Sequence, residues 1–230
     1  MREFEVIDHA ESPLGVFILR RRTMPVPDVI ELTLEHQFLM SDAVTSSERA
    51  LATRAIAMHG GNDLDVMIGG LGLGHTSKAA LDSDRVARVE VVELIQGIIG
   101  WVATGVIPLG KELMADPRFH AIQGDVFERL RRPPTMTHDV ILIDVDHSPD
   151  ERLGESSDSF YAHAALVLAA KHLKPGGVFA VWSTSESAAF EQELRKTFRE
   201  VHVEPIEFFN DTVGQDETNW LFLGKTPASR

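Results

Sequence analysis

The chain has 230 residues, with 35 acidic against 22 basic side chains and a formal net charge of -13. This balance argues against nucleic acid as the main partner, because binding phosphates needs a basic face, and it suits a small cationic substrate. The sequence has no cysteine, which excludes disulfides, thiolate zinc sites and a cysteine nucleophile. The apolar runs are too short for a membrane span, and the N-terminal stretch lacks the apolar core of a secretory signal. We therefore expect a cytoplasmic protein without a nucleic-acid or membrane partner.

Residues 1–45 are expected to form a small antiparallel β region, because short apolar runs alternate there with turn-forming residues. The runs fall into two pairs, Phe4–Ile7 with Val16–Leu19 and Val29–Leu34 with Gln37–Met40. Three consecutive arginines, Arg20 to Arg22, follow the second run. They are interpreted as a solvated strand end, with contact to an anionic ligand as the alternative.

A helix is predicted next, from Ser46 or Ser47 to the glycine pair Gly60–Gly61, which would end it. Glu48 lies in its first turn, where a negative charge complements the helix dipole. The alternative is that Glu48 points into a site beside the glycine-rich stretch that follows.

From Asp65 onward, expected strands and helices alternate, which predicts an open and mostly parallel sheet covered on both faces. The expected strands are Asp65–Ile68, Ala87–Val92, Phe119–Gln123, Asp139–Val145 and Val178–Trp182. The expected helices are Thr76–Leu81, Leu94–Ala103, Val126–Leu130, Ser159–His172 and Ser187–Phe198. A turn is expected at Lys174–Gly177. Two final strands, Val201–Phe209 and Asn219–Leu223, have no helix between them and predict a C-terminal antiparallel hairpin.

The stretch DVMIGGLGLGHT, residues 65–76, predicts a buried strand that enters a helix through a tight turn. Its glycines would let backbone N–H groups approach a ligand closely; they are Gly69, Gly70, Gly72 and Gly74. Glu93 ends the next apolar run, at the distance where nucleotide-binding α/β folds place a carboxylate for the ribose hydroxyls. The G-x-G-x-G spacing favours an adenosine ligand without a pyrophosphate, such as S-adenosylmethionine. A tight turn without a ligand is the alternative.

Further carboxylates lie just after the third expected strand and at the end of the fourth, at the sheet edge where ligands bind in open α/β folds. Asp125, beside Val126, could accept a hydrogen bond from an adenine amine or cap the helix that follows. Asp144 is placed to bind or deprotonate a cationic amine. Asp146 and His147 fall on the loop after it, where a gate or a solvated acidic loop is expected. A metal site of Asp144, Asp146 and His147 is an alternative, but the histidine spacing does not favour it, and no metal is expected.

These motifs together resemble the spermidine synthase family, within the larger class of Rossmann-like methyltransferases. The resemblance is carried by IGGLGLGHT, VVEL, DPRF–HAIQGD, DVILIDVD, FYAHAAL and LKPGG. It implies a Rossmann-like class I methyltransferase fold for residues 46–230, and a homodimer. It also implies that Glu93 holds the ribose, Asp125 the adenine amine and Asp144 the attacking amine.

The sequence departs from the family at the residues that concern the reaction. Gly72 stands where the family has the aspartate that holds the aminopropyl ammonium. The gate motif reads D-V-D-H from Asp144 to His147, and only Glu48 matches the family's Tyr-His-Glu amine cluster.

The resemblance therefore implies a transferase that binds S-adenosylmethionine or its decarboxylated form and moves an aminopropyl or other alkyl group to an amine. Asp144 would act in catalysis, helped by Asp146 or His147. Two alternatives stay open. One is a methyltransferase acting on a small molecule, and the other is a catalytically silent nucleoside-binding protein.

Overall fold

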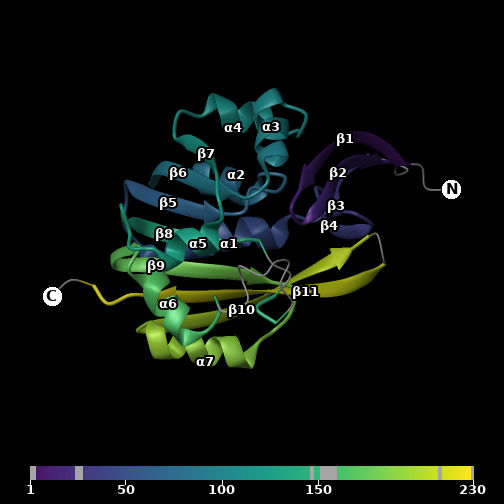
Figure 1. Cartoon of the computed structure of the whole chain (residues 1–230). Helices are drawn as coiled ribbons and strands as arrows, with labels where there is room; N and C mark the ends of the chain where they lie inside the picture. Colours follow the sequence, from purple (N-terminus) through teal and green to yellow (C-terminus); the bar gives the residue numbers. More distant parts are fainter. Residues whose placement is uncertain (1–3, 24–27, 146–147, 151–159, 212–213, 229–230) are drawn as a thin grey trace.

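The structure is a computed structural model, and it describes residues 4–23, 28–145, 148–150, 160–211 and 214–228. Within these residues the chain forms a four-stranded sheet at the N-terminus and a seven-stranded sheet after it. Figure 1 shows the N-terminal sheet in purple, beside one end of the large sheet and close to the far end of the C-terminal hairpin. The space between these parts contains the candidate site.

The N-terminal sheet is antiparallel, with its strands paired in chain order. Its strands are β1 (Phe4–Ser12), β2 (Gly15–Arg22), β3 (Val29–Leu34) and β4 (Gln37–Ser41). Leu19 and Leu32 are buried, and they belong to the same core cluster as residues of the large sheet. This small sheet is therefore held in place by packing against the rest of the protein.

The large sheet has the strand order β10-β11-β9-β8-β5-β6-β7. The strands β9, β8, β5, β6 and β7 are parallel to one another, each paired with the next. The strand β11 is antiparallel to both of its neighbours, β9 and β10. The strands are β5 (Leu64–Gly69), β6 (Val86–Glu93), β7 (Phe119–Gln123), β8 (His138–Ile143), β9 (Leu173–Ser183), β10 (Glu200–Asn210) and β11 (Gln215–Lys225). The predicted α/β fold, with a mostly parallel sheet and a C-terminal hairpin, is confirmed.

Helices cover both faces of the large sheet, and a separate core cluster lies on each face. Alternate residues of β5 face opposite ways, so that Val66 and Ile68 join one cluster and Met67 the other. The helices are α1 (Ser46–His59), α2 (His75–Leu81), α3 (Gln96–Thr104), α4 (Gly110–Ala115), α5 (Val126–Arg131), α6 (His163–Ala170) and α7 (Ala188–Thr197). Parallel strands buried on both faces explain the continuous apolar runs in the sequence.

Three details differ from the sequence predictions. Helix α4 was not predicted, and α3 begins two residues later than expected because Ile95 is still extended. The turn expected at Lys174–Gly177 is an irregularity inside β9, whose pairing with β8 shifts from His138–Leu173 to Val140–Val178. The start of the predicted helix Ser159–His172 lies outside the described residues.

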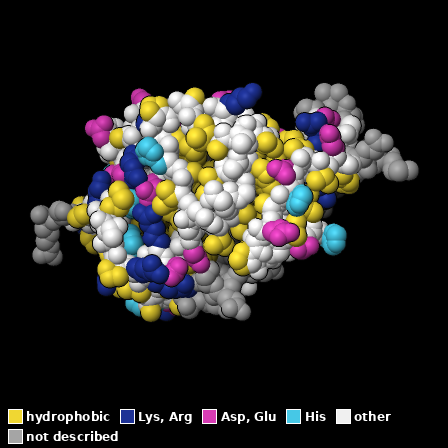
Figure 2. All heavy atoms as spheres, turned by 45° about the horizontal axis from the view of Figure 1, so that its top comes forward, with side chains coloured by type: hydrophobic (Ala, Val, Ile, Leu, Met, Phe, Trp, Pro, Cys, Tyr) yellow, Lys and Arg dark blue, Asp and Glu magenta, His cyan; other side chains and the backbone are white. Residues whose placement is uncertain are grey.

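The surface in Figure 2 carries hydrophobic side chains over much of the visible face, with Lys and Arg gathered toward the left of the view. Acidic side chains are scattered over the same face. Among the described helices, none combines the length and apolar character that crossing a bilayer would need.

Candidate active site

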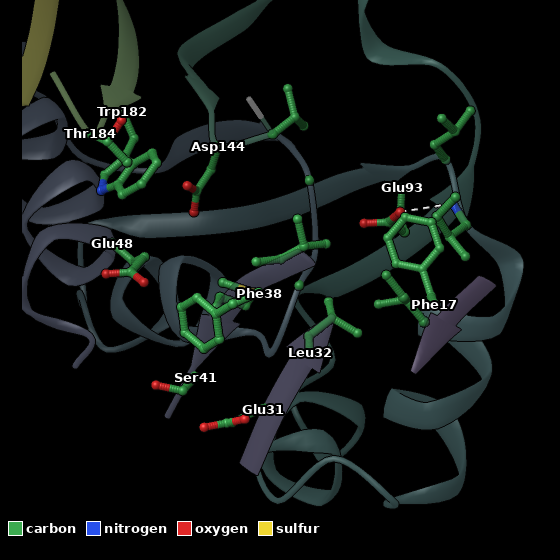
Figure 3. A pocket seen from close by; sticks show the side chains of 18 of the residues that line it. Phe17, Glu31, Leu32, Phe38, Ser41, Glu48, Glu93, Asp144, Trp182 and Thr184 are labelled. Atoms are coloured by element: carbon green, nitrogen blue, oxygen red, sulfur yellow. Dashed lines mark hydrogen bonds between the residues drawn. The ribbon is translucent and has the colours of Figure 1, made fainter. Parts of the chain in front are cut away.

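A cavity of about 1300 Å³ lies where the carboxyl ends of β5, β6, β7 and β8 meet the N-terminal sheet and the β10–β11 hairpin. Open α/β sheets bind ligands at this edge. Its lining includes Gly70, Gly72, Glu93, Asp125, Val126 and Asp144, which are six of the residues predicted for the site. Figure 3 shows Asp144 and Glu48 on one side of the cavity and Glu93 on the other.

The glycine turn between β5 and α2 brings the end of β8 close to the end of β5. Gly70 has φ +94°, and a Cβ there would lie 2.2 Å from the backbone oxygen of Asp144. Gly72 has φ +50°, and a Cβ there would lie 2.6 Å from the sulfur of Met40, on β4. Side chains at these two positions would strain the turn and displace its neighbours. Glycine is therefore required for the backbone to line the cavity at this point.

The other two glycines of the stretch have a packing role in the structure, and neither is among the lining residues of the cavity. A Cβ on Gly69 would lie 2.7 Å from a methyl group of Val126. Gly74, with φ +91°, precedes α2, and a Cβ there would lie 2.6 Å from Leu113. Both glycines permit close packing of helices against the turn.

Glu93 lies at the end of β6. Its carboxylate binds the backbone of the glycine turn and the backbone of the segment between β6 and α3. Its Oε2 accepts a hydrogen bond from the backbone N–H of Leu71 (2.7 Å), and its Oε1 accepts one from Ile95 (2.8 Å). Burial raises the pKa of Glu93, against the lowering effect of these backbone donors. A carboxylate oxygen has more than one lone pair, so Glu93 can also accept a bond from a hydroxyl group in the cavity.

Asp125 performs the capping role that the sequence offered as one of two interpretations. Its Oδ1 accepts hydrogen bonds from the backbone N–H groups of Phe127 (2.8 Å) and Glu128 (3.1 Å) at the start of α5. Oδ2 has no hydrogen-bond partner within the described part of the chain. Because Asp125 and Val126 both line the cavity, the cap leaves one carboxylate oxygen for a ligand.

Two carboxylates from distant parts of the sequence meet on one side of the cavity. Asp144 follows β8, and its Oδ2 accepts a hydrogen bond from the Thr76 hydroxyl (2.5 Å). Glu48, in the first turn of α1, is buried, and its Oε2 accepts a hydrogen bond from the Ser47 hydroxyl (2.8 Å). The Asn219 amide, from β11, donates in turn to Ser47 (2.8 Å). Among the described residues, neutral donors rather than cations hold both carboxylates in place.

The pKa values of this pair reflect the burial. Burial is the larger and the negative charge of Asp144 the smaller of the two causes that raise the pKa of Glu48 to about 7. Burial also raises the pKa of Asp144 to about 6, against the lowering effect of the hydrogen bond from Thr76. Carboxylates with pKa values near neutrality bind a cation and accept a proton from it at physiological pH.

The N-terminal sheet contributes a buried ion-pair triad to the cavity lining. Glu31, on β3, accepts a hydrogen bond from Arg20 Nε (2.9 Å) through Oε2 and pairs with Arg22 through Oε1. Arg22 is 2% exposed. The interpretation of the arginine run as a solvated strand end is therefore wrong for Arg22, because β2 alternates and turns every second residue inward.

The cavity also contains residues that the sequence did not mark as part of a site. Trp182 lines it from the end of β9, and Phe38 lines it from β4. Ser47 and Asn219, which hold Glu48, come from α1 and β11. No local pattern distinguishes these residues, because only the folded chain brings them together.

Asp146 and His147, predicted as helpers of Asp144, lie outside the described residues. Within the described ranges, no group of three His, Cys, Asp or Glu side chains is arranged to hold a metal ion.

Comparisons with known proteins agree with this geometry. A family model described as FtsJ-like methyltransferase matches residues 93–207, which is half of the chain. The chain belongs to the FtsJ-like methyltransferase family. The matched region runs from Glu93 through the end of β8 and into β10. It thus contains the strand ends from which Glu93, Asp125 and Asp144 reach the cavity.

Two curated relatives are named polyamine aminopropyltransferases. The one from Prochlorococcus marinus (strain MIT 9313) is 26% identical over 163 residues, which are 71% of this chain and 52% of that protein. Polyamine aminopropyltransferase 2 from Streptomyces coelicolor is 32% identical over 124 residues, which are 53% of this chain and 22% of that protein. The chain thus spans about half the length of the first relative and about a fifth of the second.

Solved structures of similar fold include the spermidine synthase from Thermotoga maritima, with a TM-score of 0.74 and 17% identity. The match covers 97% of this chain and 73% of that one. A probable spermidine synthase from Corynebacterium glutamicum matches with a TM-score of 0.65 and 14% identity, covering 96% of this chain and 80% of that one. The resemblance to the spermidine synthase family, within the Rossmann-like methyltransferases, is confirmed.

Proposed function

We propose that this chain is a transferase that uses S-adenosylmethionine or its decarboxylated form and moves an aminopropyl or other alkyl group onto an amine. The observation that carries the proposal is the Glu48–Asp144 pair, two carboxylates held by neutral donors in a cavity beside a glycine turn. Such a pair suits an ammonium group, which needs negative charge and hydrogen-bond acceptors when it leaves water. The names of the curated relatives support aminopropyl transfer.

The donor side of the cavity has residues that fit an adenosine. Glu93 would accept bonds from ribose hydroxyls, and Asp125 Oδ2 would accept one from the adenine amine, beside Val126. Gly70 and Gly72 leave backbone at the cavity surface where the sulfonium end would lie. A bound S-adenosyl sulfonium would supply an electrophilic carbon, with the sulfur leaving as a neutral thioether.

The acceptor side is where this chain's own groups would act. Glu48 and Asp144 would hold the ammonium form of the acceptor and take its proton, which frees the nitrogen lone pair. The new C–N bond then forms as the C–S bond breaks and its electron pair goes to sulfur. Because the sulfonium is intrinsically reactive, most of the catalysis would come from positioning the two reactants.

Methyl transfer is a second candidate, favoured by the family membership and by the surroundings of Gly72. The space beside Gly72 is filled by the Met40 thioether, so no carboxylate occupies it to hold the ammonium of an aminopropyl group. Donor preference distinguishes the two candidates. Tighter binding of the decarboxylated donor supports aminopropyl transfer, and tighter binding of the parent donor supports methyl transfer.

Isothermal titration calorimetry with S-adenosylmethionine, its decarboxylated form and methylthioadenosine tests the proposal. We expect at least one of the three to bind, and Glu93→Gln to weaken that binding by tenfold or more, since an amide replaces one accepting oxygen with a donor. Glu112→Gln, at a largely exposed position on α4, is the control and should bind as the wild type does. If none of the three compounds binds the wild type, the proposal is wrong. If a donor binds but no amine in a broad panel is alkylated, the silent nucleoside-binding alternative replaces it.

A further inference from the structure

The arginine run on β2 divides between the two faces of the N-terminal sheet. Arg21 points away from the cavity and pairs with Glu5 (3.1 Å) and Asp28 (3.9 Å). Arg20 and Arg22 are among the residues that line the cavity. Because successive side chains of a β-strand point to opposite faces of the sheet, two of the three guanidinium groups lie at the cavity and one lies on the outer face.

The triad of Arg20, Arg22 and Glu31 contains two positive charges and one negative charge. Glu31 is 3% exposed, and it pairs with Arg20 Nη2 at 2.8 Å and also with Arg22. A guanidinium has five N–H donors. Arg20 directs its Nε and Nη2 donors to Glu31, and in the described part of the protein its Nη1 donates no hydrogen bond. Its side chain is 27% exposed, so Arg20 is accessible from the cavity.

This positive triad and the Glu48–Asp144 pair lie in different regions of the same cavity. In Figure 3, Phe38 lies between Glu48 and Glu31, and Leu32 is beside it. Phe17 and Leu39 add further apolar surface to the lining. A molecule that reaches from the acidic pair to the triad therefore crosses an apolar section of the cavity.

We propose that the acceptor is a primary amine that carries a carboxylate at the far end of an apolar chain, with the amine at Glu48 and Asp144 and the carboxylate at Arg20. This inference rests on the proposed transfer to an amine and adds the class of acceptor. A carboxylate at Arg20 balances the surplus positive charge of the triad and forms a charge-assisted hydrogen bond. A diamine of the same length brings a second ammonium group to the arginine, and this like-charge contact disfavours it.

Calorimetry in the presence of saturating methylthioadenosine tests the acceptor class with matched compounds. The probes are γ-aminobutyrate, δ-aminovalerate and ε-aminocaproate, each compared with the monoamine and the diamine of equal carbon number. We expect one of the amino acids to bind about tenfold more tightly than its diamine, the difference that one partly exposed charge-assisted contact supports. The monoamine should lie between the two.

Arg20→Gln is the informative variant, because it leaves Arg22 to pair with Glu31 and so makes the triad neutral. It should remove the preference for the amino acid while methylthioadenosine binds as before. Arg20→Lys keeps the charge and should keep part of the preference, and Arg21→Gln, one residue along the same strand, should keep all of it.

The inference is overturned if the diamines bind as tightly as the amino acids at every length, or if Arg20→Gln leaves the preference unchanged. Failure of methylthioadenosine to bind the wild type would instead refute the proposed function, so the two failures are distinguishable. Thermal unfolding of each variant shows whether it is folded, and the wild-type comparison of the probes tests the inference without any variant.

Discussion

Glu48→Gln is expected to make the protein more stable at alkaline pH, although it removes a residue proposed to bind the acceptor. The carboxylate of Glu48 is buried at 7% exposure, and its pKa is raised from 4.5 to about 7. The folded protein therefore keeps the Glu48 proton up to about pH 7, whereas the unfolded chain releases it near pH 4.5. Because the folded state holds more protons in this interval, its stability falls as the pH rises through it.

The size of the effect follows from the same values. At about 1.4 kcal/mol per pH unit, the difference between 4.5 and about 7 makes the ionised carboxylate cost roughly 3 kcal/mol of unfolding free energy at pH 8. Glutamine has no charge to desolvate, and its amide oxygen can still accept the hydrogen bond from Ser47. The variant should therefore avoid most of this cost.

Urea unfolding at pH 5 and pH 8 measures the prediction. Between these values the wild type should lose roughly 2–3 kcal/mol more unfolding free energy than Glu48→Gln. Glu112→Gln, at a position 62% exposed, should follow the wild type. Equal losses in the wild type and Glu48→Gln would refute the reasoning, because they would mean that Glu48 is not a buried acid with a raised pKa.

Substitutions at three further positions, Gly70, Asp125 and Arg22, test separate parts of the site. Gly70→Ala should destabilise the protein by roughly 1–3 kcal/mol in thermal or urea unfolding, because of the φ of +94° and the contact with the Asp144 oxygen. Gly100→Ala, inside α3 with open space around it, should be neutral or slightly stabilising, and equal effects of the two would contradict this account. Asp125→Ala should cost about 1 kcal/mol through the lost cap of α5. Asp125→Asn should keep the cap and weaken methylthioadenosine binding, and unchanged calorimetric affinity would argue against an adenine contact. Arg22→Met should lower the unfolding free energy by roughly 1–3 kcal/mol, because Glu31 loses its buried partner and keeps only the partly exposed Arg20. Arg21→Met should change it by less than about 0.5 kcal/mol, and a similar loss in both would show that burial of Arg22 does not matter.

Much of the large sheet was predictable because its signals are local. The strand Asp65–Ile68 was predicted within β5, and Phe119–Gln123 coincides with β7. Parallel strands buried on both faces give continuous apolar runs, and glycines or prolines mark their ends. Helix α4 lacked such signals, since Gly110–Ala115 is short and follows no strand-like run.

Part of the site was predictable for the same reason. Glu93 and Asp125 follow predicted strands and Asp144 lies near the end of one, and the carboxyl ends of parallel strands meet at one edge of the sheet. The glycine pattern predicted a turn but could not tell which glycines reach the cavity. Gly70 and Gly72 line it, whereas Gly69 and Gly74 make room for Val126 and Leu113.

The sequence by itself determined the alternation of strands and helices, the glycine turn and the carboxylates that follow the strands, because each depends on residues close together in the chain. Only the tertiary structure decided which charges face one another. It brings Glu48 from α1 to Asp144 after β8, and it places Arg20 and Arg22 in the same cavity. Burial, and with it the raised pKa values of the acidic pair, arises only when distant segments exclude water together.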